Sequence, residues 1–135
     1  MEGQIEILNV LAAAVGAYAF SAVWYIVLSK QWVAATGMPI DQNGKPTGNG
    51  SPMPYAIGLI AMIFVAGMMR HIFQMGAIDT LGKGIGAGFG IGAFIITPWM
   101  VMNYTFGMRK PMLMLIDGVN SVVGCTIMGL ILQLF

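Results

Sequence analysis

The sequence predicts an all-α fold: an integral membrane four-helix bundle with antiparallel up-down topology and no soluble domain. Three observations support this fold class. Of the 135 residues, 58% are hydrophobic and only 8% are charged, whereas an ordinary soluble domain has roughly 25% charged residues. Four segments are apolar over the length of about 20 residues that a helix needs to cross a bilayer core. The links after the second and third segments are so short that consecutive helices must run antiparallel.

The four spans are expected at about residues 5–28, 54–75, 85–106 and 112–135, within a single transmembrane domain that covers residues 1–135. The first two spans are joined by the one long loop, residues 36–53, which is dense in Gly, Pro and Asn and ends at prolines that suit a helix start. This loop is too short to form a domain. Pro98 lacks a backbone donor, so we expect it to kink the third span.

Composition and motifs exclude several classes of function. The formal net charge of +1 provides no basic surface for a nucleic acid. Cys125 is the single cysteine, and no second cysteine or histidine stands at metal-ligand spacing, so no metal site is predicted. The sequence has no Ser/His/Asp set, no HExxH motif and no paired carboxylates at one depth, so an enzyme is the least favoured class. No cofactor is predicted either.

The most unusual local feature is a run of glycines at every second position at the start of the third span. On a helix these glycines form two lines with GxxxG spacing, which lets a neighbouring backbone approach closely. The two lines are Gly84, Gly88 and Gly92, and Gly82, Gly86 and Gly90. We expect them to pack helices together, within the monomer or against a partner. The alternative is a groove that contacts a lipid, a quinone or a pigment.

Polar residues in the spans fall into two layers when their depth is counted at 1.5 Å per residue. Arg70 lies about 22 Å along the second span and Asp117 only about 9 Å into the fourth from the opposite side, so the two cannot pair. The first layer joins Asp117 with Trp24, Tyr25, Asn103 and Tyr104. The second layer joins Arg70 and His71 with Glu6, Asp79 and Lys83.

The Asp117 layer is the stronger candidate for a functional site. Asp117, Asn120 and Ser121 lie on one face of the fourth helix because they are spaced at i, i+3 and i+4. A carboxyl group inside a membrane suits a proton carrier or a contact to a ligand. The alternative is structural: Asp117 accepts hydrogen bonds from Tyr or Trp of the first helix and holds the bundle together.

The Arg70 layer is more easily explained as an anchor. Arg70 is expected to reach the membrane surface or to neutralise Glu6. His71 lies about 100° around the helix from Arg70, so these two residues do not form one site. A role for His71 as an axial ligand of a haem or chlorophyll stays open.

Four short motifs carry a family resemblance. They are Ala22-Val-Trp-Tyr25, Leu28-Ser-Lys-Gln-Trp32, Leu115-Ile-Asp-Gly118 and Ile127-Met-Gly-Leu130. With these motifs the chain resembles the bacterial family catalogued as domain of unknown function 1761. The resemblance implies a four-helix protein of the bacterial inner membrane with no established activity, and it singles out Trp24, Tyr25 and Asp117. The Pro- and Gly-rich loop and the glycine lines depart from the family pattern.

The basic residues predict the orientation. Four of them flank the first and third links, namely Lys30, Lys45, Arg109 and Lys110, whereas Arg70 and Lys83 lie toward the other side. Because Lys and Arg are enriched on the cytoplasmic side, both termini are expected to be non-cytoplasmic.

Two functions remain in view. The first is a small accessory or structural subunit that packs against a larger membrane complex, with the lipid bilayer and other membrane subunits as its partners. The alternative is a small transporter or proton-coupled carrier that self-associates into a homo-oligomer and uses Asp117.

Overall fold

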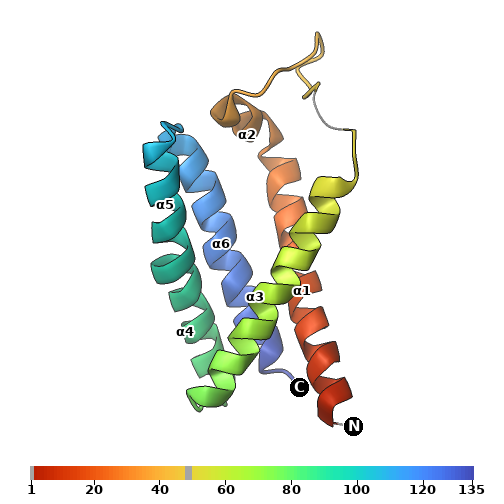
Figure 1. Ribbon diagram of the computed structural model, residues 1–135, viewed down its shortest axis with the longest axis vertical. Helices are drawn as coiled ribbons and strands as arrows, with labels where there is room; N and C mark the ends of the chain where they lie inside the picture. The colour runs from red at the N-terminus through yellow and green to blue at the C-terminus, as the bar shows by residue number, and fades with distance from the viewer. Residues whose placement is uncertain (1, 48–49) are drawn as a thin grey trace.

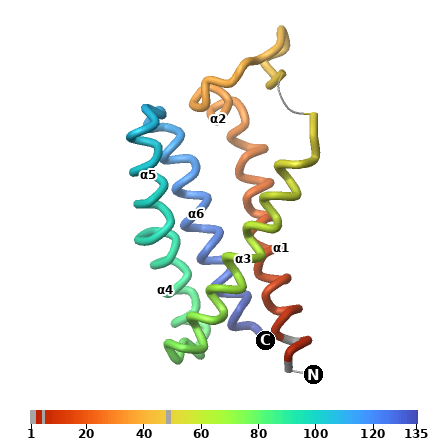
Figure 2. The backbone as a smooth tube through the Cα atoms, in the orientation of Figure 1, coloured from red at the N-terminus to blue at the C-terminus, as the bar shows by residue number. Residues whose placement is uncertain are grey.

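A computed structural model describes residues 2–47 and 50–135 of the chain. Four helices are long and apolar enough to cross a membrane, at Glu6–Val27, Met53–Met75, Leu81–Phe106 and Pro111–Leu132. They run alternately up and down, so both termini lie at the same end of the bundle (Figures 1 and 2). The predicted all-α membrane bundle is therefore confirmed. We call this end the terminal end, and the opposite end, where residues 36–53 lie, the loop end.

The helices are α1 (Glu2–Val27), α2 (Ser29–Thr36), α3 (Met53–Met75), α4 (Leu81–Ile91), the π-helical η1 (Gly92–Ile96), α5 (Thr97–Phe106) and α6 (Pro111–Leu132). The third span begins at Leu81 instead of residue 85, because the Thr80 side chain accepts a hydrogen bond from the Lys83 amide at 3.2 Å and caps α4. The sequence did not predict α2. Gly48 and Asn49 of the predicted loop lie outside the described residues.

Helix α6 is the centre of the bundle, because it contacts every other helix. Its terminal-end half meets α1 and α3 in a core made largely of small residues: Ala13, Ala14 and Ala17 are fully buried. Short side chains at these positions let the helix axes come close, which increases dispersion contact inside a membrane. A second, smaller core at the loop end joins Ala35 of α2 to Leu113 and Ile116 of α6.

The inner glycine line, Gly84, Gly88 and Gly92, packs directly on the backbone of α6. A β-carbon built on Gly84 would lie 2.6 Å from the carbonyl oxygen of Gly129, and one on Gly92 would lie 2.7 Å from the α-carbon of Val122. Real β-carbons do not approach other atoms so closely, so only glycine fits. The backbones of α4 and α6 therefore touch along three turns.

The outer glycine line, Gly82, Gly86 and Gly90, behaves differently. A β-carbon on any of these residues would have no atom within 4 Å. The line thus faces away from the rest of the described chain, so close packing within the monomer involves only one of the two predicted lines. Whether a partner covers the outer line stays a prediction.

The third span changes helix type where a kink was expected. The π-helical η1 directly precedes Thr97 and Pro98. Proline lacks an amide hydrogen and its ring crowds the carbonyl one turn earlier. A wider π turn at that point removes the crowding without breaking the span.

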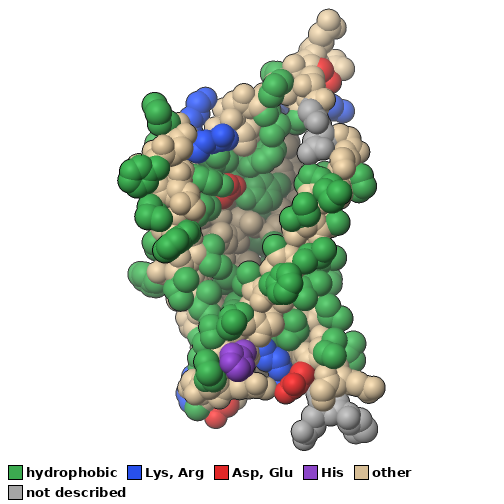
Figure 3. All heavy atoms as spheres, in the orientation of Figure 1, with side chains coloured by type: hydrophobic (Ala, Val, Ile, Leu, Met, Phe, Trp, Pro, Cys, Tyr) green, Lys and Arg blue, Asp and Glu red, His purple; other side chains and the backbone are tan. Residues whose placement is uncertain are grey.

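Helix α3 is the least supported span. It packs mainly along α1, with a smaller contact to α6. It crosses the bundle diagonally, so its loop-end half stands away from α5 and α6, and the space-filling view is hollowed between them (Figures 1 and 3).

The two glycine lines provide a matched test of packing. The Gly88→Ala variant should lower the free energy of unfolding by about 1–3 kcal/mol, because its β-carbon would meet the Cys125 carbonyl. The Gly86→Ala variant should be neutral or stabilising by up to about 1 kcal/mol, because alanine favours the helix and meets no atom. Circular dichroism during SDS titration of micelles would measure both. Equal losses in the two variants would contradict the arrangement of α4 on α6.

Candidate functional site

The Asp117 carboxylate is the centre of a hydrogen-bonded cluster near the loop end. The Tyr25 hydroxyl of α1 donates to one carboxylate oxygen at 2.6 Å, and the Tyr104 hydroxyl of α5 donates to the other at 2.6 Å. Hydrogen bonds to an ionised acceptor are short and stronger than neutral ones. One side chain of α6 therefore connects two other helices.

Two further bonds join α1 to α6 beside this carboxylate. The Trp24 indole donates to the Ile116 carbonyl at 2.9 Å, and the Ser21 hydroxyl donates to Oδ1 of Asn120 at 2.7 Å. Ser21, Trp24 and Tyr25 share one face of α1 because they are spaced at i, i+3 and i+4. This face runs antiparallel to the face of α6 that carries Asp117 and Asn120.

The structure brings together most, but not all, of the predicted cluster. The structure places Trp24 and Tyr25 of α1 beside the face of α6 that carries Asp117 and Asn120. Ser121 lies beside them, but its hydroxyl donates to the Asp117 backbone carbonyl at 3.0 Å and so serves its own helix.

Asn103 does not belong to the cluster. It is exposed on the outer side of α5, and its neighbour Tyr104 faces Asp117 instead. Successive helical residues point about 100° apart, so only one of the two can reach α6.

Ser21 was missed by sequence reasoning. Its spacing from Trp24 and Tyr25 was the available signal, because all three residues belong to the same helical face.

A second polar cluster lies at the terminal end. Arg70 of α3 forms an ion pair with Glu6 at 3.6 Å and donates a hydrogen bond to the side-chain oxygen of Asn9. Gln74 also donates to Glu6, at 3.0 Å. The expectation that Arg70 neutralises Glu6 thus agrees with the geometry. His71 is exposed and stands apart from this cluster.

Asn9 is the central residue of the terminal cluster, although the sequence did not single it out. It is fully buried. Its amide nitrogen donates to the Ile131 carbonyl at 3.3 Å and to the Phe135 carbonyl at 3.0 Å, near the C-terminal end of α6. The Phe135 carbonyl lies beyond the last residue of α6, whereas the Ile131 carbonyl also accepts the Leu134 amide at 3.0 Å. Asn9 thus joins α1, α3 and α6 with one amide group.

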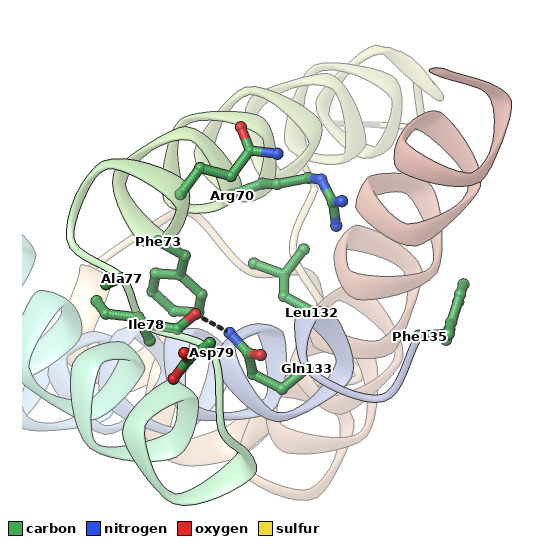
Figure 4. Close-up of a pocket in the computed structure, with 9 residues that line it drawn as sticks. Arg70, Phe73, Ala77, Ile78, Asp79, Leu132, Gln133 and Phe135 are labelled. Atoms are coloured by element: carbon green, nitrogen blue, oxygen red, sulfur yellow. Dashed lines mark hydrogen bonds between the residues drawn. The ribbon is translucent and has the colours of Figure 1, made fainter. Parts of the chain in front are cut away.

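A pocket of about 370 Å³ lies beside this cluster, lined by residues that include Arg70, Phe73, Asp79 and Gln133 (Figure 4). Gln133 forms one wall of this pocket. Its amide nitrogen donates to the Ile78 carbonyl at 2.7 Å, which connects the end of α6 to the link before α4. Within residues 2–47 and 50–135, no group of three or more His, Cys, Asp or Glu side chains could hold a metal ion.

Comparison with known proteins identifies the family. A family model described as "Protein of unknown function (DUF1761)" matches residues 8–133. The chain belongs to the DUF1761 family. The resemblance that the four short motifs indicated is therefore confirmed, and all four lie within the matched residues. No curated protein and no solved structure matches this DUF1761 chain.

The two tyrosines of this DUF1761 protein allow a test of the Asp117 cluster. Tyr25→Phe and Tyr104→Phe should each lower the free energy of unfolding by about 0.5–2 kcal/mol, since each removes one donor to the carboxylate. The double variant should cost more than the sum, because a carboxylate without donors is left inside the membrane. Unfolding in mixed micelles would supply the double-mutant cycle.

Tyr18→Phe is the matched control for this cycle. Its hydroxyl donates to the Tyr55 carbonyl in an exposed position, so its loss should change stability much less. If Tyr18→Phe cost as much as the variants of Tyr25 and Tyr104, the carboxylate would have no special role.

Proposed function

We propose that this DUF1761 protein is an accessory or structural subunit of the bacterial inner membrane that packs against a larger membrane complex. The observation that carries the proposal is that the polar side chains of the two clusters bond to neighbouring helices. Both oxygens of Asp117 accept tyrosine hydroxyls, and Asn9 and Arg70 bond to α6 and α1. These groups hold helices together, which is the work expected of a scaffold.

The same observation disfavours the carrier alternative. A carboxyl group that carries protons must exchange its partners during each cycle, and intramembrane ionisable groups of that kind face a pathway or cavity. Asp117 instead has a tyrosine donor on each oxygen, from two different helices. Breaking these bonds would remove a polar link that joins α1 and α5 to α6.

The outer surface of α4 suits helix docking. The outer glycine line leaves its backbone bare, and the exposed rings of Phe89 and Phe94 lie on the same span. A helix of another subunit could approach the α4 backbone along this line, as helices do at GxxxG surfaces. In the proposal this surface contacts the larger complex.

The proposed orientation places the loop end in the cytoplasm. At the terminal end, Arg70 pairs with Glu6 and Lys83 pairs with Asp79 at 3.1 Å. The loop end carries Arg109 and Lys110, whose side chains donate to backbone carbonyls of α2 instead of to carboxylates. The excess of Lys and Arg at the loop end supports a cytoplasmic location for it.

Native mass spectrometry of the protein, extracted mildly from its own membrane, tests the subunit role. We expect the 14.4 kDa chain to be released from a larger heteromer on activation. Gly86→Phe should free the chain from that complex by obstructing the outer glycine line. Ala61→Phe, at an exposed position on α3, should leave the complex intact. A homo-oligomer alone would contradict the proposal and favour the carrier.

Cysteine labelling tests the orientation. In a Cys125→Ala background, Gly3→Cys should react with an impermeant maleimide added outside intact cells, because Gly3 is exposed at the terminal end. Asn43→Cys, in the loop, should react only after the cells are lysed. The opposite pattern would invert the proposed topology.

A further inference from the structure

A pocket of about 400 Å³ lies along one flank of the third span. Its walls are residues of η1 and α5: Ile95, Ile96, Trp99, Met100, Asn103 and Tyr104. The Trp99 side chain is 69% exposed, although the ring is large and apolar. The pocket therefore opens toward the membrane, where its natural occupant is a molecule of the bilayer.

The chemistry of the walls changes along the helix axis. Near the bundle middle the walls are the aliphatic side chains of Ile95 and Ile96. The indole ring of Trp99 follows, and the exposed amide of Asn103 comes last, about 12 Å from Ile95 at 1.5 Å per residue. This change from hydrocarbon to an amphipathic ring and a hydrogen-bonding amide follows the order of a phospholipid, in which the acyl chain is followed by the ester and the glycerol.

Two basic residues, Arg109 and Lys110, follow α5 in the sequence, a few residues after the amide end of the pocket. Helix α5 ends with Met108 at φ 58°, and the Arg109 amide donates to the Tyr104 carbonyl at 2.8 Å. This closing pattern folds the chain back over the last turn of α5. The Arg109 backbone is thereby held next to Tyr104, a residue that lines the pocket, and Lys110 follows it in the sequence.

These two cations keep donors free for a ligand. The Arg109 guanidinium donates to the Thr36 carbonyl at 3.1 Å, and the Lys110 ammonium donates to the Ala34 carbonyl at 3.1 Å. A guanidinium has five N–H donors and an ammonium has three, so both retain capacity. In the described part of the chain no carboxylate forms a salt bridge with either, in contrast to Arg70 and Lys83 at the terminal end.

Two exposed apolar side chains near these cations also favour contact with lipid. Met108, which immediately precedes Arg109 in the sequence, is 90% exposed, and Phe106 is 85% exposed. Apolar side chains next to basic residues anchor a protein segment in the headgroup region. The surface here is shaped to contact lipid on its apolar side and an anion on its basic side.

We propose that this face binds an anionic phospholipid, with an acyl chain in the Ile95–Trp99 pocket, an ester near Asn103 and the phosphate at Arg109 and Lys110. The positive charge of Arg109 and Lys110 favours an anionic lipid over the other occupants. Neither a quinone nor a partner helix requires two cations that have no carboxylate partner. Basic residues next to a membrane span are a general means of recognising anionic headgroups.

Native mass spectrometry titrations with dioleoylphosphatidylglycerol and dioleoylphosphatidylcholine test the proposal in detergent. The wild-type protein should bind the anionic lipid at least about tenfold more tightly. Each basic residue near an anionic headgroup contributes about a factor of five, so Arg109→Gln/Lys110→Gln should weaken phosphatidylglycerol about 25-fold. Asn103→Leu should weaken both lipids several-fold.

Two controls separate a built site from general charge and from misfolding. Lys45→Gln/Lys83→Gln removes the same formal charge elsewhere and should leave both affinities unchanged. Arg109→Lys/Lys110→Arg keeps the cations that bind α2 and should retain the preference for phosphatidylglycerol. The proposal fails if the wild type binds the two lipids equally, or if the Lys45/Lys83 variant loses as much affinity as the Arg109/Lys110 variant. It also fails if a quinone or another protein occupies the face in material extracted from the native membrane.

Discussion

The contact between the backbones of α4 and α6 is the constraint on which the remaining structure depends. Lipid tails are as apolar as the helices, so helices inside a membrane gain little from leaving lipid and must gain from close contact instead. Gly84, Gly88 and Gly92 allow that contact, and Gly129 of α6 provides the matching gap on the other side. With α4 fixed against it, α6 becomes the axis around which α1 and α5 are arranged.

Polar side chains then fix the helices at two depths. Near the loop end, Asp117 joins α1 and α5 to α6, and near the terminal end, Asn9 joins α1, α3 and the end of α6. A bond of this kind specifies depth and rotation, which apolar packing alone leaves loosely defined. The two clusters differ in their third helix: α5 takes part only in the first and α3 only in the second.

Span length and depth could be predicted from the sequence, whereas rotation could not. The helical rise is constant, so counting residues placed Asp117 level with Trp24, Tyr25 and Tyr104. The rotation of residues after η1 cannot be predicted by counting at 100° per residue, because a π turn shifts the face on which later residues lie. Tyr104 therefore faces Asp117, while Asn103 faces outward.

Asn9 and Ser21 carry no charge, so hydropathy did not separate them from the polar residues that contact lipid or water. The short helix α2 continues the apolar first span after a break at Leu28. Eight residues are too few for a periodic pattern to reveal a separate helix.

Helix α3 is held by side-chain bonds mainly at its terminal end. Arg70 and Gln74 hold its terminal-end half to α1, while the loop-end half accepts an exposed hydrogen bond from Tyr18 at the Tyr55 carbonyl. A force applied to the loop would act on the loop-end half of α3, and most of the membrane thickness separates that point from Arg70 and Gln74. We therefore expect the loop-end half of α3 to shift relative to α5 more readily than α4 shifts relative to α6.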